Sequence, residues 1–211
     1  MKLTTTTMIS VDGVMQGLGT PDEDRRGDFD RGGWVLPLFD EDAAAELGKI
    51  YARADAFLFG RWTYEVFAAS WGAMAEIPPD NPVAVALNTR ARYVVSTTLK
   101  DAKWAKGVIS ADIETAIRRL KAEPGGELQV HGSGQLVRWL LERNLIDEIN
   151  LITFPLILGQ GKRLFPEIGS DRALELVRSR VSNGGAIFSV FRPAGRPRYE
   201  AATSQSTTVK S

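Results

Sequence analysis

The stretch ELQVHGSGQLVRWLLERNLIDEINLITF, residues 127–154, carries the pattern that decides the fold. It starts with a short apolar run typical of a strand, which leads into a glycine-rich turn at residues 131–134. A run with four aliphatic side chains on one helical face follows, and a second strand-like run begins near residue 148. Strand, glycine turn, helix and strand in this order indicate a parallel βαβ unit. The turn also contains the only histidine of the chain, His131.

The same alternation recurs along the chain, from a β-branched opening run to a final pair of runs separated by Asn-Gly-Gly, a strong hairpin signal. The predicted strands span residues 2–10, 55–60, 93–95, 108–110, 127–130, 148–154, and the two sides of the turn at 183–185. The predicted helices span residues 43–54, 61–71, 112–121 and about 135–143. This order predicts an α/β fold with a mainly parallel central sheet, helices on both faces and a C-terminal antiparallel hairpin.

Composition limits the classes of function. The chain has 211 residues, of which 44% are hydrophobic, so we expect one domain over residues 1–195. Residues 196–211 are polar and lack hydrophobic periodicity, which predicts a disordered tail. The 26 basic residues balance 26 acidic ones, so the composition argues against nucleic acid as a partner. With no cysteine and one histidine, we expect neither thiol catalysis nor a metal site.

The sequence also argues against a membrane partner. It contains no apolar run of 18 residues, and its N-terminus, MKLTTTTMIS, lacks the apolar core of a signal peptide. We therefore predict a cytoplasmic protein. The segment from residue 13 to residue 37 has six glycines and two prolines, and a loop of this length is either a functional cover or disordered.

Polar and glycine residues follow three of the predicted strands. Ligands of open α/β sheets bind beyond the carboxyl ends of the strands, where glycines admit a phosphate and a helix N-terminus offers free N–H groups. The relevant residues are Gly132, Ser133 and Gly134 after one strand, Gly60, Arg61 and Thr63 after another, and Ser96, Thr97 and Thr98 after a third. Three such ends along one edge of the sheet fit a dinucleotide.

Four segments together resemble the dihydrofolate reductase superfamily. They are SVDGVM (10–15), FLFGRWTYE (57–65), YVVSTTL (93–99) and LQVHGSGQLVRWLLERNLIDEINLITFPLILGQGKRLF (128–165). Within this superfamily, the chain is most similar to the branch that contains the C-terminal reductase domain of the bifunctional riboflavin-biosynthesis protein. The resemblance extends from residue 2 to about residue 192 and implies a dihydrofolate reductase-like fold with NADPH as hydride donor.

By position, the resemblance implies roles for individual residues. Gly60, Arg61 and Thr63 would hold cofactor phosphates, and Ser96 and Thr97 would lie near the adenosine 2′-phosphate. Gly132, Ser133, Gly134 and Gln135 would surround the pyrophosphate, and the SVDGVM loop would lie beside the nicotinamide. Folate reductases carry a substrate-binding carboxylate just after a Trp-x-Leu-Pro segment. In this chain WVLPLFDED begins at Trp34, so Asp40 is the candidate catalytic acid.

Four of the candidate residues have two interpretations each. Asp40 is a proton donor or the N-cap of the following helix. Asp12 contacts substrate or shapes the turn with Gly13, and Trp34 forms a wall of the substrate pocket or packs within the loop. His131 has a catalytic role or supports the glycine turn.

The sequence thus favours an NADPH-dependent reductase that transfers hydride to a C=N or C=O group of a small, pterin-like or pyrimidine-like heterocycle. The alternative is a non-catalytic nucleotide-binding protein that retains the fold. The resemblance also implies a homodimer, in which the apolar runs at residues 148–158 and 186–191 would be buried between subunits. The alternative is that both runs lie inside one core.

Overall fold

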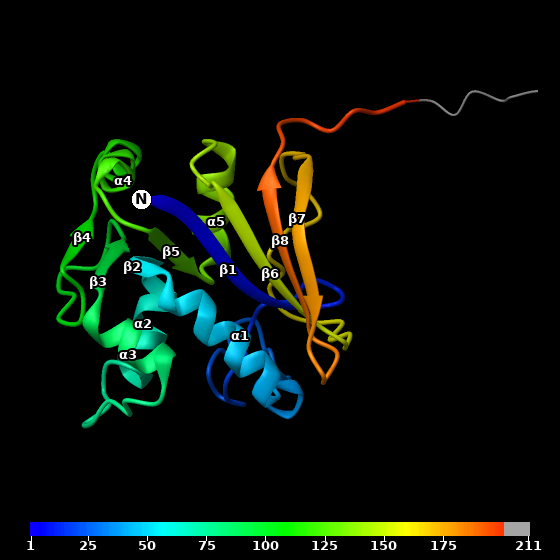
Figure 1. The fold of residues 1–211 in the computed structure, drawn as a ribbon, viewed down its shortest axis with the longest axis horizontal. Helices are drawn as coiled ribbons and strands as arrows, with labels where there is room; N and C mark the ends of the chain where they lie inside the picture. The colour runs from blue at the N-terminus through cyan, green and yellow to red at the C-terminus, as the bar shows by residue number, and fades with distance from the viewer. Residues whose placement is uncertain (201–211) are drawn as a thin grey trace, which may run out of the picture.

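The computed structural model describes residues 1–200, in which strands and helices alternate as the sequence predicts (Figure 1). The strands are β1 (Lys2–Ser10), β2 (Ala54–Gly60), β3 (Ala91–Val95), β4 (Gly107–Ile109), β5 (Glu127–His131), β6 (Glu148–Phe154), β7 (Leu174–Val181) and β8 (Ile187–Pro193). The helices are a 3-10 turn η1 (Leu36–Leu38) and the α-helices α1 (Glu41–Ala52), α2 (Arg61–Ser70), α3 (Pro82–Thr89), α4 (Ile113–Ala122) and α5 (Gly134–Glu142).

The strands form one sheet in the order β4-β3-β2-β5-β1-β6-β8-β7. All neighbours from β4 to β6 pair in parallel, whereas β8 pairs antiparallel with both β6 and β7. The predicted mainly parallel sheet with an antiparallel C-terminal hairpin is therefore confirmed. Because the parallel strands share one direction, the ends of β2, β3 and β5 meet at the same edge of the sheet.

Helices cover both faces of the sheet, as predicted. Phe57 and Phe59 of β2 pack with α1 and α3 against one face, whereas Ala56 and Leu58 of the same strand pack with α4 and α5 against the other. Successive side chains of a strand point to opposite faces, so a central strand covered on both sides needs apolar residues at every position. This explains the continuous apolar run of β2.

Helix α3 lies in a segment, residues 72–90, where our sequence analysis identified no element. The side chain of Asn81 accepts hydrogen bonds from the N–H groups of Val83 and Ala84, and Pro82 occupies the first turn. An N-cap asparagine followed by proline is a recognised helix-start signal, and it was present in the sequence. The eight-residue helix was missed because its apolar residues show little periodicity.

The long loop between β1 and η1 is organised around the side chain of Gln16. The side-chain amide nitrogen of Gln16 donates to the carbonyl oxygens of Asp24 (3.1 Å) and Arg26 (2.8 Å), and the indole N–H of Trp34 donates to the backbone carbonyl oxygen of Gln16 (2.8 Å). Phe29 of the same loop is buried. These contacts fold the loop onto the domain and support the interpretation that it is a cover.

None of the helices within residues 1–200 has the length and the apolar character needed to cross a membrane. Of the predicted disordered tail, residues 196–200 are described and contain neither helix nor strand. Residues 201–211 lie outside the described part of the chain.

Candidate functional site

A cleft of about 1070 Å³ opens at the edge of the sheet where β2, β3 and β5 end. All nine residues predicted to bind a cofactor border this one cleft. They are Gly60, Arg61, Thr63, Ser96, Thr97, Gly132, Ser133, Gly134 and Gln135. The structure thus brings together segments that lie up to 75 positions apart in the sequence. Their roles in binding remain predictions.

The side chain of Ser133 joins two of the three strand ends. Its hydroxyl oxygen accepts the backbone N–H of Gly60 (2.9 Å), and its hydroxyl donates to the hydroxyl oxygen of Thr63 (2.6 Å). A Cβ atom on Gly60 would lie only 2.7 Å from this oxygen, so the close approach requires glycine. Gly132 has a φ of +66°, a left-handed conformation that favours glycine for a different reason. The two glycine turns are therefore held as one unit.

Helices α2 and α5 start at the cleft, and neither start has a hydrogen bond from a capping side chain. By contrast, Asp40 and Asn81 cap α1 and α3, respectively. The first N–H groups of an α-helix have no partner inside the helix, and its N-terminus carries a partial positive charge. Two such ends beside the glycine turns can bind the phosphates of a dinucleotide, so the residues present fit a pyrophosphate-containing cofactor.

The guanidinium group of Arg61 spans the ends of β2 and β3. It donates to Glu65 (2.7 Å) and to the hydroxyl oxygen of Thr98 (2.7 Å), which is the residue after Thr97. The Ser96 hydroxyl oxygen accepts the N–H groups of Thr98 and Leu99 and so shapes this corner of the cleft. Five lysine or arginine residues and three acidic residues border the cleft, so its charge favours an anionic ligand.

The long loop covers the opposite side of the cleft. Arg26 lies over the ring of Trp62 in α2, 3.7 Å from the ring centroid, and forms a cation–π contact across the cleft. Arg26 also pairs with Asp24. Burial opposes ionisation of Asp24, but the hydrogen bonds from Arg26 outweigh it and hold the pKa of Asp24 below its usual value. Burial and the charge of Arg26 lower the pKa of Lys162, which also borders the cleft.

One wall of the cleft, called the inner wall below, is formed by residues from β1, α1 and β5 that were not assigned to ligand binding from the sequence. They are Thr6, Met8, Leu47, Tyr51 and His131. The rings of His131 and Tyr51 are stacked with centroids 4.1 Å apart, and a ring nitrogen of His131 lies 2.9 Å from the amide oxygen of Gln129. Burial lowers the pKa of His131 to about 3 and raises that of Tyr51. Both rings are therefore neutral near pH 7.

The remaining three candidates do not border the cleft. Asp40 caps α1 through the N–H of Ala43 (2.6 Å), and it also accepts the N–H of Gly184 in the hairpin turn. This position supports the helix-cap interpretation and lacks the contact with the cleft that a proton donor needs. Trp34 is buried and contacts Phe154 edge to face with ring centroids 5.9 Å apart, which supports packing within the loop.

Asp12 acts within the turn after β1. It accepts the Ser10 hydroxyl (2.6 Å) and the N–H groups of Leu158 (3.0 Å) and Gly159 (2.8 Å). Burial tends to raise the pKa of Asp12, but these hydrogen bonds outweigh it and lower the pKa to about 2. Its carboxylate therefore joins two loops, as the turn interpretation requires.

The buried neutral state of His131 leads to a prediction on the pH dependence of stability. The unfolded chain binds a proton at this histidine below about pH 6.5, whereas the folded protein, with a pKa of about 3, does not. Because the unfolded state binds more protons in this window, stability is lost as the pH falls from 6.5 towards 3. His131→Phe removes this contribution. Urea unfolding at about pH 7 and pH 4.5 should show the variant losing less stability than the parent on acidification.

Asp12 provides the internal reference for that measurement. Its pKa lies at about 2 in the folded protein and 3.8 ordinarily, so its contribution is present above about pH 4 and is lost only below that value. The parent and the His131→Phe variant both have this contribution from Asp12. Equal losses of stability in parent and variant between pH 7 and 4.5 would contradict a buried neutral His131.

The sheet order, the terminal hairpin and the cleft at the strand ends define the dihydrofolate reductase-like class of reductase folds. Within it, the chain belongs to the RibD C-terminal domain family, whose model matches residues 1–188. The uncharacterized protein YyaP of Bacillus subtilis (strain 168) is 23% identical over 183 residues, which cover 87% of this chain and 90% of YyaP.

Two solved structures share the fold. A putative riboflavin biosynthesis protein from Shewanella sp. PV-4 superposes with a TM-score of 0.63 at 20% identity, covering 92% of this chain and 99% of that one. Dihydrofolate reductase from Enterococcus faecalis, complexed with NADP(H), superposes with a TM-score of 0.58 at 16% identity, covering 91% and 96%. At these identities the likeness shows the fold alone.

Proposed function

We propose that this protein is an NADPH-dependent reductase that transfers hydride to a C=N or C=O group of a small pterin-like or pyrimidine-like heterocycle. One observation carries the proposal: nine residues from three strand ends and two uncapped helix starts border the same cleft, whose inner wall combines apolar side chains with Thr6 and His131. The family and the fold, shared with a reductase that binds NADP(H), support the same function.

The residues at the strand ends would hold the cofactor, which supplies the hydride. The strands whose ends border the cleft follow one another in the order β3-β2-β5-β1, which gives the cleft two distinct ends. Arg61 and Ser96, near β3 and β2, would bind the phosphate-rich end, and the turn of Gly132 and Ser133 would bind the pyrophosphate. The wall formed by β1 and α1 would then receive the reacting rings, and the loop carrying Arg26 would exclude water.

The protein must also deliver a proton to the reduced product. Asp40 lies outside the cleft, and His131 is neutral at physiological pH, so neither is placed to act as the acid. Our proposal therefore assigns the proton to a water molecule held between the loop and the inner wall. The cytoplasmic location predicted from the sequence remains part of the proposal.

Titration of the protein with NADPH and with NADH, followed by tryptophan fluorescence, tests the proposal. Trp62 and Trp139 border the cleft and provide the signal. We expect micromolar binding of NADPH, weaker binding of NADH, and oxidation of NADPH when dihydrofolate, pterins or pyrimidines are screened. Binding without oxidation by any of them would favour the alternative, a nucleotide-binding protein without turnover. Failure to bind either cofactor would contradict both.

We also propose that the protein is a homodimer, with a contact surface that differs from the one expected from sequence. The apolar residues of β6 and β8 that face the core, among them Phe154 and Phe188, are buried within one chain. Strand β7 is the sheet edge, and its apolar side chains Leu174, Leu176 and Val177 are exposed. An exposed apolar edge strand is a surface suited to pairing with a second chain.

Sedimentation of the parent and of Leu176→Lys tests the dimer. The leucine is 54% exposed, so the substitution should leave the fold intact while placing a charge in the contact. We expect the parent to sediment as a dimer at micromolar concentration and the variant as a monomer. A monomeric parent would contradict the proposal.

A further inference from the structure

The position of the single histidine supports an inference about which substrates the cleft accepts. Gln129 determines the state of the His131 ring. Its amide nitrogen donates to the carbonyl oxygen of Ile50 (2.7 Å) and to the carboxylate of Glu127 (2.7 Å). Both partners only accept hydrogen bonds, so the amide cannot be turned round without losing two contacts. The amide oxygen is thereby fixed towards His131.

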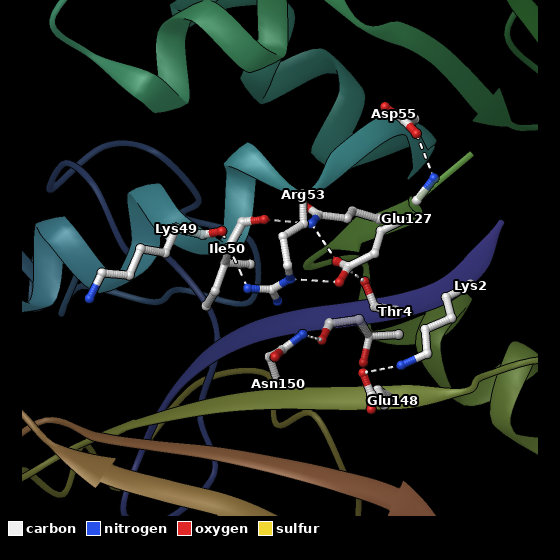
Figure 2. A network of polar contacts seen from close by, with 12 residues as sticks. Lys2, Thr4, Lys49, Ile50, Arg53, Asp55, Glu127, Glu148 and Asn150 are labelled. Carbon is white, nitrogen blue, oxygen red and sulfur yellow. Dashed lines mark hydrogen bonds and ion pairs between the residues drawn. The ribbon is translucent and has the colours of Figure 1, made fainter.

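The carboxylate of Glu127 is itself held in place. It accepts the guanidinium of Arg53 (2.6 Å) and the hydroxyl of Thr4 (3.1 Å), as Figure 2 shows beneath α1. A chain of oriented hydrogen bonds therefore runs from Arg53 at the surface through Glu127 and Gln129 to His131. Because the donor and the acceptor of each link are fixed, the orientation of the Gln129 amide determines which group the His131 ring must present to it.

This chain selects one tautomer of His131. The amide oxygen of Gln129 only accepts, so Nε2 of His131, 2.9 Å away, must carry the hydrogen. Burial keeps the ring neutral, with one ring proton, because it lowers the pKa of His131 to about 3. The other nitrogen, Nδ1, is therefore a bare hydrogen-bond acceptor. Within residues 1–200, the hydrogen bond with Gln129 is the one that the ring makes, and it does not involve Nδ1.

Thr6 lies beside His131, because the two residues pair in register on β1 and β5. Both side chains border the cleft, and both residues are at least nine-tenths buried. The Thr6 hydroxyl is buried without a hydrogen-bond partner among the described residues. A buried hydroxyl without a partner is costly, and a ligand group that pairs with it removes that cost. The residue with the free acceptor and the residue with the unpaired hydroxyl are thus neighbours on adjacent strands at the inner wall.

We propose that His131 is a specificity-determining residue: its Nδ1 accepts a hydrogen bond from a ring N–H of the substrate, and the Thr6 hydroxyl donates to the neighbouring carbonyl oxygen. The substrate class is then a heterocycle with a cyclic amide edge, N–H next to C=O. This inference rests on the proposed function, since it places the substrate ring, and not the cofactor phosphates, at the β5-β1 end of the cleft.

The protonation of the two ring nitrogens of His131 can be observed directly by nitrogen NMR, because the chain contains only one histidine. In protein labelled with ¹⁵N-histidine, we expect the nitrogen spectrum near pH 7 to show a protonated Nε2 and an unprotonated Nδ1. Addition of NADPH alone should leave Nδ1 nearly unchanged. Addition of pterin, which has a cyclic amide, to the NADPH complex should shift the Nδ1 resonance towards that of a hydrogen-bonded nitrogen. A protonated Nδ1 in the free protein would overturn the inference whatever the function is.

Binding of pterin and 3-methylpterin to the NADPH complex measures the effect. The methyl group replaces the amide hydrogen, so the parent should prefer pterin by about 3- to 10-fold, the worth of one neutral hydrogen bond. His131→Phe keeps the aromatic stacking but has no acceptor, and it should remove this preference. His131→Asn places an amide oxygen near the position of Nδ1 and should restore part of it. Thr6→Val should weaken the binding of pterin by a similar factor. The affinity for NADPH should be unchanged in all three variants.

The outcomes separate this inference from the function on which it rests. Absence of NADPH binding to the parent would contradict the proposed function, while the nitrogen spectrum would still test the tautomer. Normal NADPH binding with no shift of Nδ1 on adding pterin would overturn the inference alone. A shift of Nδ1 caused by NADPH itself would assign the hydrogen bond to the cofactor and also overturn it. If His131→Phe weakened the binding of pterin and of 3-methylpterin by the same factor, the histidine would have only a structural role.

Discussion

Replacing Arg61 with alanine is expected to weaken NADPH binding by about 10- to 100-fold, which corresponds to the loss of one or two hydrogen bonds to a charged group. The guanidinium lies between Glu65 and Thr98, at the corner where Ser96 and Thr97 follow β3. A phosphate in this corner would gain both charge and paired donors from it. The loss should be larger for NADPH than for NADH if this corner binds the 2′-phosphate.

Glu65→Ala is the matched control for Arg61→Ala. Both variants remove the same exposed ion pair, which contributes little to stability, but only one removes the guanidinium. We expect the control to bind NADPH as well as the parent does, or more tightly, because a negative charge leaves the cleft. Fluorescence titrations at two salt concentrations measure both effects. An Arg61→Ala protein that folds and binds NADPH normally would refute the assignment of this corner.

Replacing Asp40 with alanine is expected to destabilise the protein by about 1–2 kcal/mol, the usual worth of an N-cap, and to lower its Tm by about 2–8 °C. The carboxylate caps α1 through Ala43 and also holds the hairpin turn at Gly184. Asp40→Asn keeps an oxygen that can accept the N–H of Ala43 but loses the second oxygen, which accepts the N–H of Gly184, so its stability should lie between those of Asp40→Ala and the parent. Thermal unfolding followed by circular dichroism measures both variants.

The two Asp40 variants also decide between the cap and the catalytic acid. An asparagine side chain caps a helix but cannot donate a proton as an acid. Once a substrate is known, we therefore expect Asp40→Asn to retain the turnover of the parent. Loss of turnover in Asp40→Asn with an unchanged Tm would show that the carboxylate takes part in the reaction and that our placement of Asp40 outside the site is incomplete.

The predicted cofactor residues other than Gln135 could be found from the sequence because they belong to local patterns, whereas Gln135 and the individual roles were implied by the family resemblance. A turn suited to phosphate needs a strand, glycines and a helix start that are consecutive in the chain, and the segments around Gly60-Arg61 and Gly132-Ser133 have this order. Parallel strands then place such turns at one edge by topology alone. The local patterns and the order of the elements were therefore sufficient to predict that these residues converge on one cleft.

The inner wall could not be predicted in this way. Tyr51 reads as one apolar residue on a helix face, and Thr6 as one of four consecutive threonines in a strand. Only the pairing of β1 with β5 and the packing of α1 place both beside His131. Asp40 shows the reverse case, since its position after a Trp-x-Leu-Pro segment implied catalysis, while the structure places its carboxylate on the backbone at the start of α1 and so supports the helix-cap interpretation.

The sequence by itself therefore determined the fold class, the order of the strands and of the helices other than α3 and η1, and the convergence of the glycine turns on one edge of the sheet, because these depend on periodicity and on neighbours along the chain. Only the tertiary structure decided which side chains form the wall where a substrate ring would lie. It also decided which nitrogen of His131 carries the proton, because that depends on the hydrogen bond with Gln129, which is held in turn by Ile50 of α1. Contacts between elements distant in the chain follow from packing, which no local pattern encodes.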